Sequence, residues 1–397
     1  MRIGIDARTL GFSGIGRYTE NLIRELLLID NKNEYTIFVQ KNGRNKNYEL
    51  RIKNNGQKKF INHKSRFLNL KMIEVDAPIY SFKEQFNFLM AVNREKLDVM
   101  HFTHFNRPIF YNRPTVVTIH DLTPIYFQGK KHNSVFKKWA YNLVLKTALN
   151  KANKIIAVSS FTKKDIVKHF PNLDAEKIAV IYEGANSRFA PIFNSKFSIS
   201  KRILKPYLLY VGVWREHKNL LGLIKAFNKF KSKVLNSQHS KLKLVIVGKS
   251  DPYYSEVSEA ARRSKFSKDI ILTGYVKDEE LISLYQNAEA FVFPSFYEGF
   301  GLPPLEAMSF GCPVVSSNAA SLPEILGDAA LYFDPYNVND ITEKIRNLIS
   351  DEKIRKELVA KGKKQVLKYS FKTMAEKTLK LYNEINLSTK LEKMEKR

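Results

Sequence analysis

Cysteine is almost absent from this chain, which has only Cys312 in 397 residues. A single cysteine cannot form an internal disulfide, and this usage fits a reducing compartment. Long apolar runs are also lacking, since no stretch approaches the roughly 20 residues of a membrane-spanning helix. Met1–Asp6 has the pattern of a first strand rather than of a signal peptide. We therefore expect a cytoplasmic protein in which Cys312 is a buried structural thiol.

Acidic residues are scarce as well. The chain has 39 Asp and Glu against 66 Lys and Arg, a formal net charge of +27. Residues 1–200 hold 33 basic and 16 acidic residues, a net charge of +17, and Lys41–Arg66 holds nine basic residues against Glu49 alone. Such a surface could contact anionic membrane or nucleic acid, or could simply be solvated. No nucleic-acid motif accompanies the charge, so no nucleic-acid partner is expected.

Predicted strands and helices alternate through both halves of the chain, which is typical of parallel sheets covered by helices on both faces. The length suffices for two such domains with full cores. We predict strands at 2–7, 34–40, 98–102, 115–120, 154–158, 178–182, 207–213, 243–247, 270–272, 290–293, 313–316 and 330–333. We predict helices at 17–28, 161–169, 220–231, 279–286, 303–309 and 371–386.

The predicted fold class is α/β, with two doubly wound, Rossmann-like domains facing a central cleft. The first domain would span 1–190, a linker 191–205 and the second domain 206–370. The segment 371–397 is predicted to be helical and to pack back toward the first domain. Ligands of such sheets bind at the carboxyl ends of the strands.

Two glutamates lie close together in the segment Pro-Ser-Phe-Tyr-Glu-Gly-Phe-Gly-Leu-Pro-Pro-Leu-Glu-Ala-Met that ends at Met308. Glu298 is expected on a strand-to-helix loop and Glu306 one turn into the helix, whose first turn can hold Pro303. Carboxylates accept hydrogen bonds from sugar hydroxyls, and the free N–H groups of a glycine-rich helix start suit a phosphate. A plain turn would explain the glycines and prolines but not both carboxylates. The loop has the groups that a sugar joined to a diphosphate requires.

This block resembles the signature of glycosyltransferase family 4 (group 1), retaining enzymes of the GT-B fold. The resemblance covers most of the chain, with further matches at the N-terminal glycine loop, Thr-Ile-His120-Asp, Ala157-Val-Ser-Ser-Phe, the turn with Arg215 and Lys218, and Gly327-Asp-Ala-Ala. It implies a hexosyltransferase, a class that includes mannosyltransferases, acting in cell-surface polysaccharide or glycolipid synthesis. The donor would be a GDP- or UDP-linked sugar bound by the second domain. The acceptor would be a glycan or lipid-linked molecule on the side of the first domain.

The resemblance also implies roles for single residues. Glu306 would hold the nucleotide ribose, Glu298 the sugar hydroxyls, and His120 would orient or polarise the reacting sugar. Lys218 matches the diphosphate lysine of the family. The family's arginine often directly follows the glycine, where this chain has valine, so we expect Arg215 to take over that role from a shifted position.

The resemblance also implies further contact residues in the rest of the donor site. The resemblance implies that the Gly16 backbone lies near the diphosphate and that Gly248 and Lys249 lie beside the nucleotide. It further implies that the backbone and side chains of Tyr275 and Val276 border the base, and that the amides of Phe300, Gly301 and Leu302 face the diphosphate. Arg17 and Tyr18 are possible acceptor contacts by the same resemblance. No nucleophilic carboxylate is evident, which favours a front-face mechanism over double displacement.

Asp-x-Asp, the acidic motif by which many glycosyltransferases bridge a metal to the donor diphosphate, is absent. We expect no metal and no cofactor besides the nucleotide-sugar co-substrate. The histidines of His101-Phe-Thr-His104 are expected to pack in a strand rather than to bind a metal. Ser321-Leu-Pro-Glu324 matches a helix capping box.

Fragments of two nucleotide-binding motifs and the basic charge suggest functions other than glycosyl transfer. Gly14-x-Gly16 is half of a dinucleotide fingerprint whose third glycine is replaced by Thr19, and the segment ending at Gly248-Lys-Ser lacks the upstream glycine of a phosphate loop. A nucleotide-sugar epimerase would share the two-domain fold but needs extra acids near the sugar. A basic protein that binds nucleic acid or anionic membrane is the alternative from another class. For the transferase, the basic first domain suggests reversible peripheral contact at the inner face of a membrane.

Overall fold

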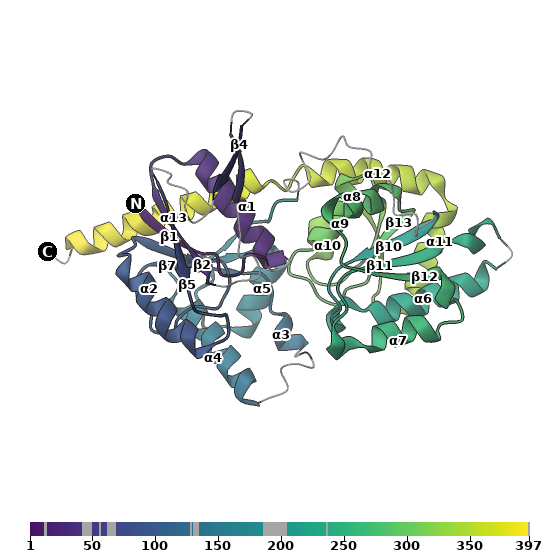
Figure 1. Ribbon diagram of the computed structural model, residues 1–397, viewed down its shortest axis with the longest axis horizontal. Coiled ribbons are helices and arrows are strands. Elements are labelled where there is room, and N and C mark those ends of the chain that lie inside the picture. The colour runs from purple at the N-terminus through teal and green to yellow at the C-terminus, as the bar shows by residue number, and fades with distance from the viewer. Residues whose placement is uncertain are drawn as a thin grey trace. The chain divides into compact units, whose positions relative to one another are not determined.

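The computed structural model describes residues 1–11, 14–41, 50–54, 57–61, 69–127, 129, 135–185, 205–235 and 237–395. The chain forms two compact units (Figure 1). The first contains Met1–Leu122, Ser134–Gly184 and Ser370–Arg397, and the second contains Thr123–Asn133 and Ala185–Tyr369. Thr123–Asn133 therefore groups with the second unit, although the sequence-based boundaries assign it to the first. The predicted linker, 191–205, lies outside the described residues except for Lys205.

The first unit is built on a seven-stranded parallel sheet of order β5-β2-β1-β6-β7-β8-β9. Its strands are β1 (Arg2–Asp6), β2 (Glu34–Gln40), β5 (Leu70–Val75), β6 (Val99–Phe102), β7 (Thr115–Ile119), β8 (Lys154–Ala157) and β9 (Ile178–Val180). A separate hairpin comprises β3 (Leu50–Asn54) and β4 (Gln57–Ile61). β7 is buried along its whole length, as expected for a strand covered by helices on both faces.

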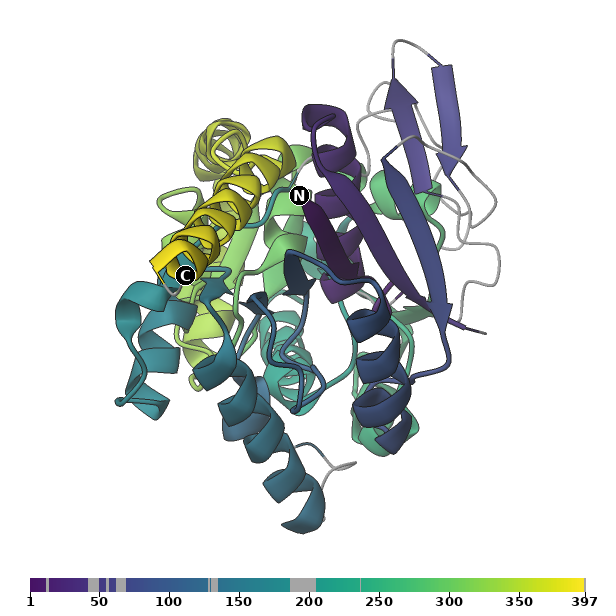
Figure 2. The same cartoon turned by 90° about the vertical axis from the view of Figure 1, so that its left-hand side faces the viewer.

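The helices of the first unit lie on both faces of this sheet. They are α1 (Gly14–Ile29), the π-helical segment η1 (Glu84–Phe88) that runs into α2 (Leu89–Arg94), α4 (Val135–Lys151), α5 (Ser160–His169), the 3₁₀ turn η3 (Ala175–Lys177) and α13 (Phe371–Glu395). α13 packs against α1 and contributes Met374, Ala375 and Tyr382 to the core (Figure 2). Right-handed crossovers put α2 and α4 on the opposite face.

The second unit has a six-stranded parallel sheet of order β12-β11-β10-β13-β14-β15. Its strands are β10 (Tyr207–Val211), β11 (Lys243–Val247), β12 (Ile270–Gly274), β13 (Ala290–Phe293), β14 (Val314–Ser317) and β15 (Ala330–Phe333). This order confirms the two-domain, doubly wound α/β class.

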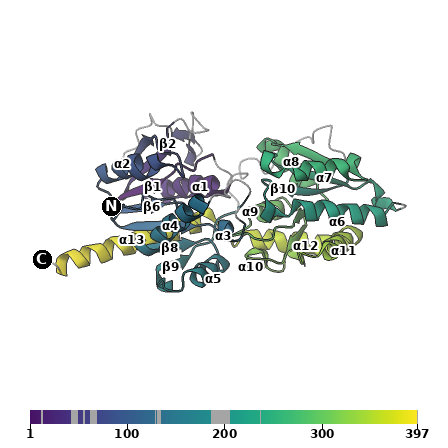
Figure 3. The same cartoon turned by 90° about the horizontal axis from the view of Figure 1, so that it is seen from below.

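Helices and short turns complete the second unit. The helices are α3 (Thr123–Tyr126), α6 (Leu220–Lys233), α7 (Glu256–Arg263), α8 (Asp278–Asn287), α9 (Leu302–Ser309), α10 (Leu322–Leu326), α11 (Val338–Ser350) and α12 (Glu352–Val366). The 3₁₀ turns are η4 (Glu216–Lys218), η5 (Gln238–Lys241), η6 (Pro252–Tyr254) and η7 (Ser267–Asp269). α11 packs against α6, and α12 packs against α9 (Figure 3). Cys312 is buried, as predicted. None of the helices in the described part of the chain is long and apolar enough to cross a bilayer.

His101 links the sheet of the first unit to its C-terminal helix. Its Nδ1 lies 2.6 Å from the Tyr382 hydroxyl, and its Nε2 lies 2.8 Å from Thr118 Oγ1. The side chain is fully buried and both ring nitrogens have partners, so His101 packs in its strand as predicted. Burial, with a smaller effect of the nearby His120 charge, lowers the pKa of His101 to about 3.

This depressed pKa predicts that acid destabilises the first unit. Below pH 6.5 the unfolded chain binds a proton at His101 that the folded chain does not, so stability falls as the pH drops. One such group contributes a slope of up to about 1.4 kcal/mol per pH unit. His101→Gln is expected to reduce the slope of the unfolding free energy between pH 6.5 and 5 by about that amount, measured by denaturant titration. An unchanged slope would contradict the prediction.

Candidate active site

Loops after four neighbouring strands gather at one edge of the second unit's sheet. β12, β11, β10 and β13 are adjacent and parallel, so their carboxyl ends lie side by side. The chain leaves β10 toward β11 but leaves β13 toward β14, in the opposite direction. Ligands of open α/β sheets bind at such a switch point. The loops after β10 and β13 carry Lys218 and Glu298, respectively.

Lys218 and Glu298 form an ion pair at this switch point. Lys218 Nζ donates to Glu298 Oε1 at 2.5 Å, although 80 residues separate them. Their side chains are 14% and 12% exposed, and Nζ also lies 5.5 Å from the centre of the Phe293 ring. The structure thus brings together two residues that the sequence analysis singled out independently. The pair offers one positive and one negative group at the edge where a ligand would enter.

Asn219 fixes the loop that carries Lys218. It caps α6 by accepting from the Gly222 N–H at 3.2 Å, and its Nδ2 donates to the carbonyls of Pro294 and Pro335. These bonds tie the start of α6 to the loop after β13. His217, between the two cations, is largely buried, and burial together with the charges of Lys218 and Arg215 lowers its pKa to about 2. The loop therefore carries cations at Arg215 and Lys218, while His217 stays neutral.

Arg215 has a different partner from Lys218. Its Nη1 lies 2.8 Å from Asp251 Oδ2, and its guanidinium lies 5.6 Å from the centre of the Tyr254 ring. The Arg215 side chain is 37% exposed. Because Asp251 is only 12% exposed, the pair is half-buried, and only the Arg215 side of it is accessible to a ligand phosphate.

The start of α9 is shaped by Gly301, which is its N-cap in a left-handed conformation with φ of 100°. A Cβ at Gly301 would lie 2.8 Å from a terminal methyl of Leu322, which would have to shift, and the left-handed backbone itself favours glycine. Phe300 and Leu302 are buried at 4% and 9% exposure. A proline lies in the first turn of α9, as predicted.

Ser321 holds the loop from the opposite side. Its hydroxyl donates to the carbonyls of Glu298 at 2.9 Å and Phe300 at 3.2 Å. The predicted capping box is therefore wrong, because Ser321 makes no side-chain cap to α10 and its hydroxyl supports the Glu298 loop instead. Further along α9, Glu306 is 5% exposed and accepts a hydrogen bond from the Tyr285 hydroxyl at 3.2 Å.

The loops after β11 and β12 lie on the other side of β10. Gly248 has φ of 151°, and a Cβ there would lie 1.9 Å from the Gly212 carbonyl oxygen, so the two backbones can approach only without a side chain. Lys249 and Tyr275 are exposed, whereas Val276 is 8% exposed. Lys249 and Tyr275 are therefore accessible to a ligand, and Val276 mainly supports their loop.

Trp214, between β10 and Arg215, is a residue that the sequence analysis missed. Its side chain is 2% exposed, and its indole N–H has no hydrogen-bond acceptor among the described residues. Burying such a donor without an acceptor costs about 1–3 kcal/mol. The only sequence signal was its position in the loop already identified by Arg215 and Lys218.

The first unit presents a second group of polar residues around His120, directly after β7. His120 Nδ1 lies 2.9 Å from Glu183 Oε1, and Nε2 lies 2.9 Å from the Thr103 carbonyl oxygen. Burial alone would lower the His120 pKa, but the hydrogen bond and charge of Glu183 outweigh it, and the pKa is raised. Both ring nitrogens face acceptors, which is the arrangement of a protonated imidazolium. Sequence reasoning missed Glu183, which follows β9 and is 4% exposed.

Tyr18 and Gly16 occupy the first turns of α1. Tyr18 is fully buried, donates to or accepts from Thr118 Oγ1 at 3.0 Å, and packs edge-on against His120 at 4.9 Å. Tyr18 therefore supports the His120 ring from a buried position, and its contact with an acceptor stays a prediction. Gly16 is also buried, with its backbone close to Thr9 and Gly11.

Metal ligands do not cluster in the described ranges, where no three His, Cys, Asp or Glu side chains come together in a way that could hold an ion. The ionic features of the two regions are therefore the Lys218–Glu298, Arg215–Asp251 and His120–Glu183 pairs.

Comparison with known proteins identifies the relatives of this chain. Residues 12–189 match the family model described as Glycosyltransferase Family 4, and residues 192–365 match the one described as Glycosyl transferases group 1. The chain belongs to glycosyltransferase family 4. The resemblance of the glutamate block to the signature of this family is thereby confirmed.

Two relatives and one solved structure illustrate the breadth of the family. The chain is 29% identical over 380 residues to the O-antigen chain mannosyltransferase B of Escherichia coli, covering 93% of this chain and 96% of that one. It is 30% identical over 270 residues to the O-antigen chain mannosyltransferase RfbU of Salmonella typhimurium, covering 68% and 69%. The sucrose-phosphate synthase of Thermosynechococcus elongatus has the same fold, with a TM-score of 0.73 at 18% identity over 98% of this chain and 100% of that one. These matches confirm the GT-B fold of this family 4 glycosyltransferase.

Proposed function

We propose that this family 4 glycosyltransferase is a retaining hexosyltransferase that builds a cell-surface polysaccharide. It would transfer a sugar from a GDP- or UDP-linked donor to a glycan or lipid-linked acceptor. The observation that carries this proposal is the Lys218–Glu298 pair at the switch point between β10 and β13, beside the start of α9. The O-antigen mannosyltransferase relatives support mannose as the first sugar to test.

Donor binding divides between two loops in this proposal. Glu298 accepts hydrogen bonds from the sugar hydroxyls, and Glu306 from the ribose. Lys218 and Arg215, with the N–H groups of Phe300–Leu302, stabilise the charge of the departing diphosphate. In the described part of the chain, the buried indole N–H of Trp214 has no acceptor, so it is one further donor in the loop that carries Arg215 and Lys218.

A front-face reaction accounts for retention without an enzyme nucleophile. The bond between the anomeric carbon and the diphosphate oxygen breaks, and the acceptor oxygen bonds to the same face of that carbon. The acceptor proton passes to the departing phosphate, which gives the glycoside and the nucleoside diphosphate. Glu183 is 4% exposed and bound to His120, which supports its role as a partner of the imidazolium rather than as a nucleophile.

His120 would act in this reaction through its charge. With both nitrogens engaged by Glu183 and Thr103, the imidazolium is held in one orientation and can stabilise negative charge near the reacting sugar. The nucleotide-sugar epimerase alternative has no specific observation in its favour, and neither has nucleic-acid binding.

The place of action in this proposal is the inner face of the cytoplasmic membrane, with reversible, peripheral contact. The basic cluster of residues 41–66, which suggested such contact, lies outside the described side chains except for Lys41. Its contribution is tested by neutralising Lys58, Lys59, Lys64 and Arg66 and measuring liposome co-sedimentation at low and high salt.

The proposed reaction is tested with a donor panel. Purified protein is incubated with GDP-mannose and with UDP-, GDP- and ADP-glucose, and nucleotide release is measured with and without a lipid-linked acceptor. Release from one donor, increased by the acceptor, is the expected result. Failure to turn over any donor would contradict the proposal.

Metal removal gives a separate prediction. Because cationic side chains and helix N–H groups are proposed to stabilise the leaving diphosphate, activity is expected to persist in EDTA at near the untreated rate. The measurement is nucleotide release with and without EDTA, followed by addition of Mg²⁺ or Mn²⁺. Complete loss in EDTA that Mn²⁺ restores would overturn the metal-free mechanism.

A further inference from the structure

The helical segment from residue 82 through η1 and α2 has two faces of opposite environment. One line of side chains at four-residue spacing is buried at 0–1% exposure: Glu84, Phe88 and Val92. A second line, offset by two residues and therefore on the opposite side, is exposed at 78%, 66% and 53%: Phe82, Phe86 and Met90. An outward face of a soluble helix is normally polar. Here three consecutive outward positions are large and apolar.

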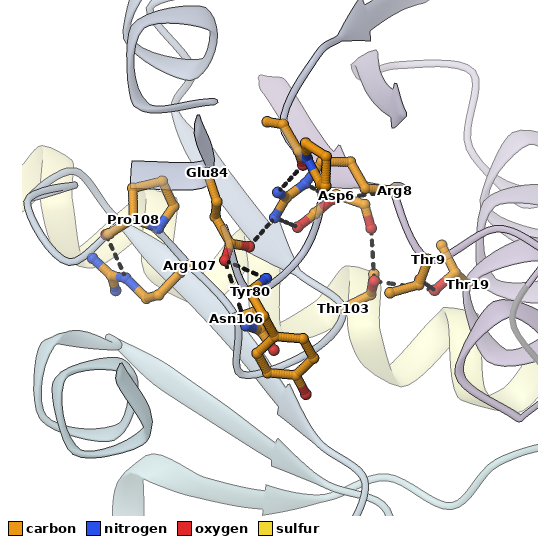
Figure 4. Close-up of polar contacts among 12 residues, drawn as sticks. Asp6, Arg8, Thr9, Thr19, Tyr80, Glu84, Thr103, Asn106, Arg107 and Pro108 are labelled. Carbon is orange, nitrogen blue, oxygen red and sulfur yellow. Dashed lines mark hydrogen bonds and ion pairs between the residues drawn. The ribbon is translucent and has the colours of Figure 1, made fainter. Parts of the chain in front are cut away.

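Glu84, in the buried line, holds this helix through the polar contacts drawn in Figure 4. Glu84 Oε1 accepts from Arg8 Nη2 at 2.8 Å, and the same guanidinium binds Asp6. The Arg8 guanidinium also lies 3.7 Å above the centre of the Phe88 ring. The carboxylate of Glu84 accepts as well from the Tyr80 N–H at 3.1 Å. Turning the helix to hide its apolar face would break the buried Arg8–Glu84 ion pair, so the apolar side chains stay on the outside.

The exposed apolar surface continues onto the neighbouring loop. Gln85 accepts from the Ile109 N–H at 2.9 Å and donates to the Arg107 carbonyl, so the segment after β6 is bonded to η1. Phe110, the next residue, is 68% exposed. Lys151, at the end of α4, donates to the Ile109 carbonyl at 2.9 Å. The loop therefore lies between η1 and α4.

α4 adds further apolar and basic side chains. Trp139 and Leu143, one turn apart, are 59% and 38% exposed. The sequence of α4 contains four lysines and no acidic residue, and Lys146 is exposed. At the other side, Arg94 and Lys96 are exposed at the end of α2. The apolar side chains are thus flanked by positive charge.

We propose that this aromatic face is a docking surface for an anionic lipid bilayer. The aromatic face is defined by Phe82, Phe86, Met90, Phe110, Trp139 and Leu143. Apolar side chains would enter the headgroup boundary while the flanking lysines and arginines contact anionic headgroups. Charge complementarity selects this occupant over a second copy of the chain, because two copies would bring the same positive charges together. The purpose of docking rests on the proposed function, since a lipid-linked acceptor is held at a bilayer.

The experiment is co-sedimentation with vesicles of phosphatidylcholine alone or with 30% phosphatidylglycerol, at low and high salt. Wild type is expected to bind the anionic vesicles at low salt and to be released by high salt. The variant Phe82→Gln/Phe86→Gln/Met90→Gln is expected to bind at least about tenfold more weakly, since each exposed side chain contributes apolar burial. Phe110→Gln provides a second, single-site variant that leaves η1 untouched.

A matched control lies on α13, where another three apolar side chains are exposed at 61%, 52% and 72%: Leu387, Leu391 and Met394. Leu387→Gln/Leu391→Gln/Met394→Gln is expected to bind as the wild type does. Loss of binding in this control with retention in both aromatic-face variants would overturn the proposal. The proposal would also be overturned if the wild type stayed in the supernatant with anionic vesicles at low salt. A wild-type dimer in light scattering that becomes a monomer in the Phe82/Phe86/Met90 triple variant would overturn it as well.

Nucleotide release separates docking from catalysis. Donor turnover without acceptor is expected to be equal in wild type and in the aromatic-face variants, because the altered residues lie outside the donor site. Their thermal midpoints report that the fold is intact. Vesicle binding by a protein that turns over no donor would leave docking supported and the proposed function contradicted. Donor turnover without vesicle binding would support the proposed function and contradict the docking proposal.

Discussion

Glu298→Gln is expected to lower kcat by about 10²–10³-fold, the usual effect of removing one positioned polar group from an active site. Glutamine keeps the size of the side chain, but its amide cannot give two charged acceptors to sugar hydroxyls. It also leaves Lys218 without its carboxylate partner. The measurement is steady-state nucleotide release and product formation with the donor identified by the panel.

Glu306→Gln serves as the matched control for this variant. Glu306 is buried beside the Tyr285 hydroxyl and is proposed to hold the ribose, so its substitution is expected to raise the donor KM more than it lowers kcat. Wild-type turnover in Glu298→Gln would remove Glu298 from the site. Circular dichroism checks folding, because the ion pair is largely buried.

Lys218→Ala is expected to weaken donor binding by at least about 100-fold, since the ammonium is proposed to bind the diphosphate and its side chain is only 14% exposed. The substitution also removes the ion-pair partner of Glu298, whose side chain is 12% exposed. Lys218→Arg is expected to retain most of the affinity, because charge matters more than fork geometry for this role. The measurement is calorimetric titration with the nucleoside diphosphate.

Arg215→Ala is the companion variant for this experiment. Arg215 is more exposed and already paired with Asp251, so its loss is expected to cost less than that of Lys218. Equal affinity of Lys218→Ala and wild type for the nucleotide would contradict the proposed role. Restoration by Lys218→Arg distinguishes the loss of a charge from a general loss of structure.

The strands around the site could be predicted because they are short, largely apolar runs that are buried along their whole length, as in β7 and β13. Strands buried on both faces leave an unambiguous pattern, and β2, β11, β13 and β15 begin and end at the predicted residues. Glu298 and Lys218 were likewise recognised from local patterns. Their contact across 80 residues follows from the strand order, which the sequence does not state.

Other features could not be predicted, because they depend on long-range contacts that leave no pattern in the nearby sequence. Glu183 follows a short strand and is identified only by its 2.9 Å contact with His120. Ser321 fits a capping pattern, yet its hydroxyl binds two carbonyls on another loop because those are nearer in the fold. α2 and α4 were not predicted, since the outward apolar face of α2 hides the usual amphipathic signal, and α4 has apolar side chains on several sides.

The assignment of α13 to the first unit has a consequence for the order of folding during synthesis. Residues 185–369 must be translated before Met374 and Tyr382 can reach the core formed with α1 and β6. At about 5–20 residues per second this interval lasts about 10–40 s. Throughout it, the nascent first unit exposes the apolar surface that α13 will cover, and His101 lacks its tyrosine partner. The part of the protein that leaves the ribosome first is therefore the last to become complete.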